Sequence, residues 1–144
     1  MTLQEYKTIR DLAWIVLINA HINEIPVDVS KIFRAYKINK PKTPGNSRFD
    51  KALAASSSIL NFFGLNPSFD KMLAVRILAP MIVVREIKIK SAEQLAKVFD
   101  LPHEIAAQRF ERFEMLESRN KFLISNLEKK VLQEFQPWIQ NYSG

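Results

Sequence analysis

The chain has 144 residues, a formal net charge of +6 and no cysteine. The lack of cysteine excludes disulfide scaffolds, thiolate zinc sites and cysteine nucleophiles, and because it suits a reducing compartment we expect a cytoplasmic protein. The length is typical of one domain with its own core, and three glycines are too few for a turn-rich β architecture, so we predict an all-α domain.

The N-terminal segment has the pattern of two helices. Thr2 and Glu5 form a capping box, and apolar residues at helical spacing continue to Ala20. Pro26 is predicted to open a second, short helix in PVDVSKIFRAYKI. The most apolar run of the first helix, LAWIVLI, lacks a positive flank and is too short to cross a bilayer, so we expect neither a secretory signal nor a membrane partner.

Residues 31–51 hold the excess positive charge, with seven basic residues against one acidic residue. Turn-forming residues are dense in 39–47, which predicts an exposed basic loop. The aromatic residues of this region sit at core-like helical positions, so base stacking with single-stranded nucleic acid is not indicated. A solvated surface is the simple interpretation. A partner-binding surface would use Lys37, Lys40, Lys42, Arg48 and Lys51.

Two helices are predicted in the middle of the chain. Ser47 and Asp50 repeat the capping pattern before RFDKALAASSSILNFF, and Gly64 suits the C-terminal cap of this helix. The Asn-Pro pair at 66–67 opens the next helix. Pro80 interrupts that helix because proline lacks a backbone donor.

The segment SAEQLAKVFDLPHEIAAQRFERF, residues 91–113, has the length and pattern of a helix-turn-helix, and Ser91 with Gln94 is predicted to cap its first helix. Its turn falls at Asp100, where glycine is usual and aspartate is tolerated. A DNA-binding role would direct five side chains toward the groove: His103, Glu104, Ala107, Gln108 and Glu111. Because 91–116 holds five acidic and three basic residues, it would repel phosphates, which favours a structural helix pair.

Two other segments complete the predicted bundle of six to eight helices. Residues 81–89 are rich in β-branched side chains, so their pattern fits a short strand or a helix. Residues 117–141 are predicted to form a long amphipathic C-terminal helix, with an apolar stripe of Ile124, Leu127, Val131, Phe135 and Trp138. The stripe either closes the core, which we prefer, or pairs with a second chain, so monomer and homodimer both stay open.

The sequence offers little for catalysis. The two histidines, His21 and His103, are far apart, and neither has a second imidazole or a carboxylate at the spacing of an HExxH zinc site. The serine run 56–58 lacks the G-x-S-x-G setting of a nucleophile, and no glycine-rich phosphate loop occurs. We therefore expect no metal, no cofactor and no catalytic residue.

Three blocks of the chain resemble, in order, the ImmA/IrrE family of zinc-dependent peptidases: IPVDVSKIFRAYKI, MLAVRILAP and SAEQLAKVFDLPHEIAAQRFERFEML. Between them, RFDKALAASSSILNFF aligns without a gap with the family's HExxH helix. On that register Leu53 and Ser57 stand where the two histidine ligands belong, and Ala54 stands where the catalytic glutamate belongs. The third ligand falls near Phe69.

The resemblance implies a degenerate ImmA/IrrE-like helical domain over residues 1–144. Only residues 38–47 separate the segment that resembles the family's entry helix from the HExxH-like helix, which implies that most of the family's β-hairpin is absent too. The family is often found beside repressors of mobile elements, which implies a pseudoenzyme that binds a repressor or another element-encoded protein. A DNA-binding regulator acting through 91–113 is the alternative, and an active zinc peptidase ranks third.

Overall fold

The computed structural model describes residues 1–39, 45, 47–119 and 125–142. Over these ranges every regular element is a helix: α1 (Leu3–Asn19), α2 (Val29–Ala35), α3 (Arg48–Phe62), the short 3-10 helix η1 (Pro67–Phe69), α4 (Asp70–Leu78), α5 (Met81–Glu86), α6 (Ala92–Phe99), α7 (His103–Ser118) and α8 (Asn126–Asn141). The predicted all-α class is confirmed. As far as the described ranges extend, no helix has both the length and the apolar sequence needed to cross a membrane.

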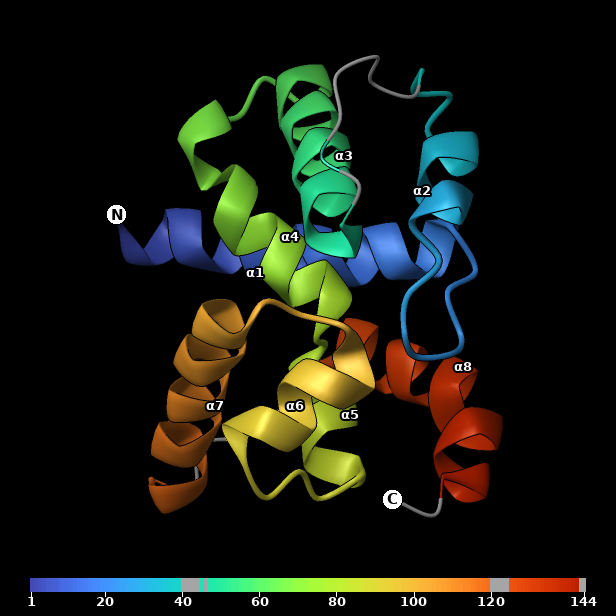
Figure 1. The fold of residues 1–144 in the computed structure, drawn as a ribbon. Coiled ribbons are helices and arrows are strands. Elements are labelled where there is room, and N and C mark those ends of the chain that lie inside the picture. The colour runs from blue at the N-terminus through green and yellow to red at the C-terminus, as the bar shows by residue number, and fades with distance from the viewer. Residues whose placement is uncertain (40–44, 46, 120–124, 143–144) are drawn as a thin grey trace.

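Helix α1 crosses the middle of the molecule (Figure 1), with α2 and α3 on one side and α6, α7 and α8 on the other. Helix α4 packs against both α1 and α3, and α8 packs against α1 and α5. Buried side chains from all eight α-helices belong to one hydrophobic cluster. The core is therefore continuous from one side of α1 to the other.

Three predicted N-terminal caps are confirmed. Thr2 and Glu5 make the reciprocal bonds of the capping box, at 2.8 and 3.0 Å. The hydroxyls of Ser47 and Ser91 each accept a bond from the backbone N–H three residues later, at 3.0 Å in both helices. These bonds satisfy N–H groups that a helix leaves unpaired in its first turn, so short local motifs fix where α1, α3 and α6 begin.

The predicted start of the second helix at Pro26 is wrong. Helix α2 begins at Val29, after Asp28, whose carboxylate accepts a bond from the Ser30 backbone N–H at 3.0 Å. An aspartate in this position supplies the acceptor that the free N–H groups of the first turn require, whereas a proline supplies none. Pro26 therefore lies in the connection that precedes the helix.

The segment 81–89 contributes a helix, α5, and no strand. The carbonyl of Pro80 accepts bonds from the N–H groups of Val83 and Val84, at 3.0 and 3.1 Å. All four residues from Met81 to Val84 are buried. A short helix that is apolar on every side is stable when it is surrounded by other helices, and this explains why β-branched residues do not force a strand here.

Five helices end in the same backbone motif. After α1, α2, α3, α5 and α6, one residue adopts a left-handed conformation, and the next N–H donates to the carbonyl five residues earlier. Gly64 occupies the left-handed position after α3, as predicted, and Asp100 occupies it after α6. In the other three helices the residue is His21, Lys37 or Lys88, with φ values of 55°, 54° and 57°. Each of these costs about 1–2 kcal/mol relative to glycine.

The C-terminal helix is shorter than predicted. Helix α8 begins at Asn126, where the Ser125 hydroxyl accepts a bond from the Glu128 N–H at 3.2 Å, and residues 117–118 belong to the end of α7. Val131 and Phe135 are buried, and α8 packs on α1 and α5, so this part of the stripe closes the core as preferred. Its first predicted member, Ile124, lies outside the described residues.

Candidate functional site

The four peptidase-like positions lie on α3 and η1. Leu53 and Ala54 are half-buried against the hydrophobic core, Ser57 is exposed, and Phe69 is half-buried. Among the residues that the structure describes, no group of three or more His, Cys, Asp or Glu side chains is placed to hold a metal ion. At the register of the peptidase active site, α3 therefore presents an aliphatic surface and one hydroxyl.

The predicted helix-turn-helix-like pair is present as α6 and α7, which pack against each other. Asp100 takes the left-handed conformation at the turn, with φ 56° and ψ 58°, and Leu101 is buried. All five predicted groove residues are exposed on α7 or at its start. Glu104 and Glu111 share this side of the helix with exposed Glu114, so α7 presents an acidic face that opposes the phosphates of DNA.

Arg48, one of the basic candidates, connects separate parts of the fold. Its guanidinium is half-buried, donates to the carbonyl oxygen of Val27, and pairs with the carboxylate of Asp100 at 3.1 Å. The ion pair joins the first turn of α3 to the turn between α6 and α7, two regions more than fifty residues apart in sequence. Of the basic candidates, Arg48 is therefore one whose side chain is already bonded to other residues of the chain.

The other basic candidates are divided between two regions. Lys37 is exposed directly after α2, and Lys51 is exposed on α3. Lys40 and Lys42 lie outside the described residues. Lys37 also borders a concave surface at the ends of α2 and α3.

An apolar surface lies where α2 and α3 end. Phe62 and Phe63 are 78% and 47% exposed, and their rings meet edge to face with centroids 5.0 Å apart. Beside them is a groove of about 540 Å³, which we call the aromatic groove, lined by Ala35, Tyr36, Lys37, Ile38, Ser58, Ile59, Asn61 and Phe62. Exposed aromatic pairs of this kind are unusual on a surface that contacts only water.

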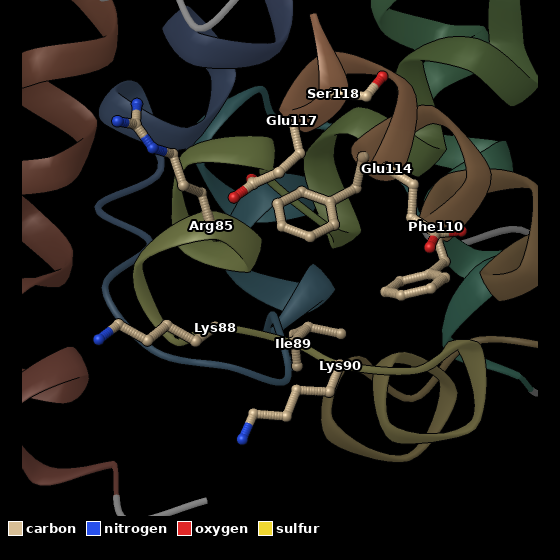
Figure 2. Close-up of a pocket in the computed structure, with 9 residues that line it drawn as sticks. Arg85, Lys88, Ile89, Lys90, Phe110, Glu114, Glu117 and Ser118 are labelled. Carbon is tan, nitrogen blue, oxygen red and sulfur yellow. The ribbon is translucent and has the colours of Figure 1, made fainter. Parts of the chain in front are cut away.

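A second concave surface has mixed charge. Figure 2 shows Lys88, Ile89 and Lys90 along one side of this cavity and Phe110, Glu114 and Glu117 of α7 along the other. The cavity measures about 570 Å³. Because cations and carboxylates both line it, its charge does not select an ion of either sign.

The third feature is a cluster of three arginines beside Tyr6, which we call the arginine cluster: Arg76 of α4, with Arg109 and Arg112 of α7. Arg109 is 6% exposed and donates from Nε and Nη2 to the carbonyl oxygen of Ala79, at 3.1 and 2.8 Å. Arg112 donates to the Tyr6 hydroxyl at 2.7 Å, and the guanidinium of Arg76 lies 4.7 Å from the centre of the Tyr6 ring.

The charges of the cluster act on one another. Burial, followed by the nearby Arg76 and Arg112 charges, lowers the pKa of Arg109 to about 9. Burial raises the pKa of Tyr6, but the charges and hydrogen bonds of Arg76 and Arg112 outweigh it, so this pKa falls below its ordinary value of 10.0. The cluster therefore holds two half-buried guanidinium groups close to a buried one of the same charge.

Comparison of the chain with protein-family models, with curated proteins and with solved structures finds no match. The ImmA/IrrE resemblance therefore rests on the three sequence blocks.

The structure brings together two predicted residues from different hypotheses. Phe69, at the third-ligand position, and Gln108, on the helix-turn-helix face, line one cavity with the arginine cluster. The cluster itself was missed by sequence reasoning, which counted Arg109 and Arg112 only toward the charge of 91–116. A signal was available, because Arg76 interrupts the otherwise apolar run MLAVRILAP, where a buried or half-buried cation needs a partner.

Proposed function

We propose that this chain is a non-catalytic, regulatory protein-binding module similar to the ImmA/IrrE peptidases, with the aromatic groove as its docking surface. The observation that carries the proposal is the exposure of Phe62 and Phe63 beside a groove that can receive a side chain. Aromatic residues in such positions supply most of the binding energy of many protein interfaces.

The chemistry of the groove indicates the kind of partner. Its walls are mostly apolar, with the half-buried ring of Tyr36 and the side chains of Ile38 and Ile59. Lys37 is the single charged residue among the described residues of the lining. A protein segment with an apolar side chain flanked by acidic residues fits this pattern. The sequence resemblance favours a repressor or another protein of a mobile element as the source of that segment.

The non-catalytic part of the proposal is supported by the four peptidase-like positions. Leucine and alanine side chains at 53 and 54 offer no atom that binds zinc or takes a proton from water. The single hydroxyl of Ser57 and the ring of Phe69 do not complete a ligand set. Metal analysis of the purified protein checks this part, and one tightly bound zinc per chain would overturn it.

The protein-binding part is tested by affinity capture from the native cell extract. The bait is the full chain as wild type, as the double variant Phe62→Ser, Phe63→Ser, and as Leu3→Ser. Leu3 is 70% exposed on α1 and lies outside the groove, so its variant controls for the loss of exposed apolar surface. We expect a protein that wild type and Leu3→Ser retain equally and that the double variant loses.

Two results would contradict the proposal. One is a captured protein that all three baits retain equally. The other is sequence-selective, steeply salt-dependent DNA binding that Gln108→Ala abolishes, which would favour the helix-turn-helix alternative. Gln108 suits this test because it is exposed, whereas the neighbouring Arg109 is buried.

A further inference from the structure

The arginine cluster is a group of positive charges without a carboxylate partner. All fifteen Asp and Glu residues of the chain fall within the described ranges. None of them forms an ion pair with Arg76, Arg109 or Arg112 in the described part of the structure. A buried cation in a folded protein normally has an anionic partner, because its desolvation is otherwise uncompensated.

The hydrogen bonds of the cluster leave donors unused. Arg109 contacts Ala79 through Nε and Nη2, and Arg112 contacts Tyr6 through Nη2. Nε of Arg76 is buried and has no hydrogen-bond partner among the described residues. A guanidinium carries five N–H donors, so the contacts within the chain satisfy only part of what the three arginines offer.

The cluster forms part of the wall of an open cavity of about 460 Å³ between α4 and α7. Lys71 adds a fourth cation to this lining, and Ser68 and Gln108 add a hydroxyl and an amide. No described residue on the lining is acidic. The cavity therefore combines positive charge with neutral donors, which is the composition of an anion-binding surface.

A carboxyl group on an adjoining cavity does not change this balance. Glu128 and Tyr6 line a cavity of about 340 Å³ that the three arginines also border. Burial raises the pKa of Glu128, and the cations that act on it are Arg10 and Arg85. The carboxyl group of Glu128 is thus not the partner of the arginine cluster.

We propose that Arg76, Arg109 and Arg112 form a binding site for a phosphate group in the cavity between α4 and α7. A phosphate carries more negative charge than a carboxylate, and its several oxygens can accept bonds from more than one guanidinium. The site lies outside the aromatic groove and does not depend on the protein-binding proposal. Its ligand is either inorganic phosphate or a small organic phosphate monoester.

Isothermal titration calorimetry tests the site with two probes, inorganic phosphate and phenyl phosphate, at constant ionic strength. Wild type is compared with Arg76→Met and with Arg34→Met, which removes the same charge from an exposed position on α2. We expect saturable binding at one site per chain in wild type and Arg34→Met. Arg76→Met should bind about tenfold more weakly or worse, because it loses charged hydrogen bonds. Tighter binding of phenyl phosphate would identify an organic monoester, and equal binding would identify inorganic phosphate.

A second readout follows the titration of Tyr6 and leaves all three arginines in place. Bound phosphate partly neutralises Arg76 and Arg112, so the pKa of Tyr6 should rise when phosphate is added. Absorbance titration of wild type minus Tyr6→Phe isolates this group from the other tyrosines. The proposal is overturned if wild type shows no saturable binding, if both arginine variants bind alike, or if saturating phosphate leaves the Tyr6 titration unchanged.

Discussion

Arg109 closes the C-terminal end of α4 by donating two hydrogen bonds, at 3.1 and 2.8 Å, to the buried carbonyl oxygen of Ala79. Carbonyl groups in the last turn of a helix lack partners within the helix and carry partial negative charge, so a cation is favourable there. The contact spans thirty residues of sequence and fixes α7 against the end of α4. It also places a charged group inside the molecule.

The first prediction concerns this contact. Arg109→Met should lower the free energy of unfolding by about 1–3 kcal/mol, because the buried carbonyl of Ala79 loses its donors while the side-chain volume is largely kept. Urea denaturation measures the change. The matched control Arg34→Met should stay within about 0.5 kcal/mol of wild type because Arg34 is exposed. Equal stability of both variants would mean that relief of repulsion in the arginine cluster offsets the lost bonds.

The second prediction concerns pH. The charges of Arg76 and Arg112 outweigh burial and lower the pKa of Tyr6, so the folded protein loses this proton at lower pH than the unfolded chain. The resulting stabilisation is fully present above the unfolded value near 10 and is lost as pH falls through the lowered folded value. The difference in unfolding free energy between wild type and Tyr6→Phe should therefore grow with pH across this window. A difference that does not change with pH would contradict the lowered pKa.

The third prediction concerns a helix end. Lys88 is left-handed, with φ 57°, so Lys88→Gly removes a conformational cost of about 1–2 kcal/mol. Glycine also increases the entropy of the unfolded chain, which lowers the free energy of unfolding by about 0.4–1 kcal/mol. We expect a net gain in unfolding free energy of about 0.5–1 kcal/mol by urea denaturation. Lys88→Ala removes the same amine but keeps the strain, and it should not gain stability.

These cases show what the sequence could and could not predict about helix ends. The caps at Thr2, Ser47, Ser91 and Gly64 follow local rules in which one side chain or one glycine decides the geometry, and all four are confirmed. At Lys37 and Lys88 the left-handed residue is followed by an isoleucine, Ile38 or Ile89, that packs on the core. Tertiary packing selects that conformation against the local preference.

The candidate site was harder to predict for a related reason. Arg76 and Arg109 lie more than thirty residues apart, on different helices. Arg76 is conspicuous in its apolar run, but neither segment indicates that the two residues are neighbours. Their convergence depends on how α4 and α7 meet, which no local pattern specifies. The exposure of Phe62 could not be predicted either, because an aromatic residue at the end of an apolar helix is normally expected to be buried.

The fourth prediction separates core from surface by making one substitution at two positions. Phe135 of α8 is fully buried, and Phe62 of α3 is 78% exposed. Phe135→Ala should lower the unfolding free energy by about 3–5 kcal/mol, because it leaves a cavity in the core. Phe62→Ala should change it by no more than about 0.5 kcal/mol. Similar losses in both variants would contradict the assignment of Phe62 to a docking surface.

The central claim, that the aromatic groove is a protein-docking surface, is tested most directly by a dissociation constant. The captured partner is immobilised, and binding of wild type, Phe62→Ser and Leu3→Ser is measured by biolayer interferometry. We predict that Phe62→Ser weakens binding more than about tenfold, as for a hot-spot aromatic, while Leu3→Ser binds like wild type. Equal dissociation constants for wild type and a folded Phe62→Ser would contradict the claim.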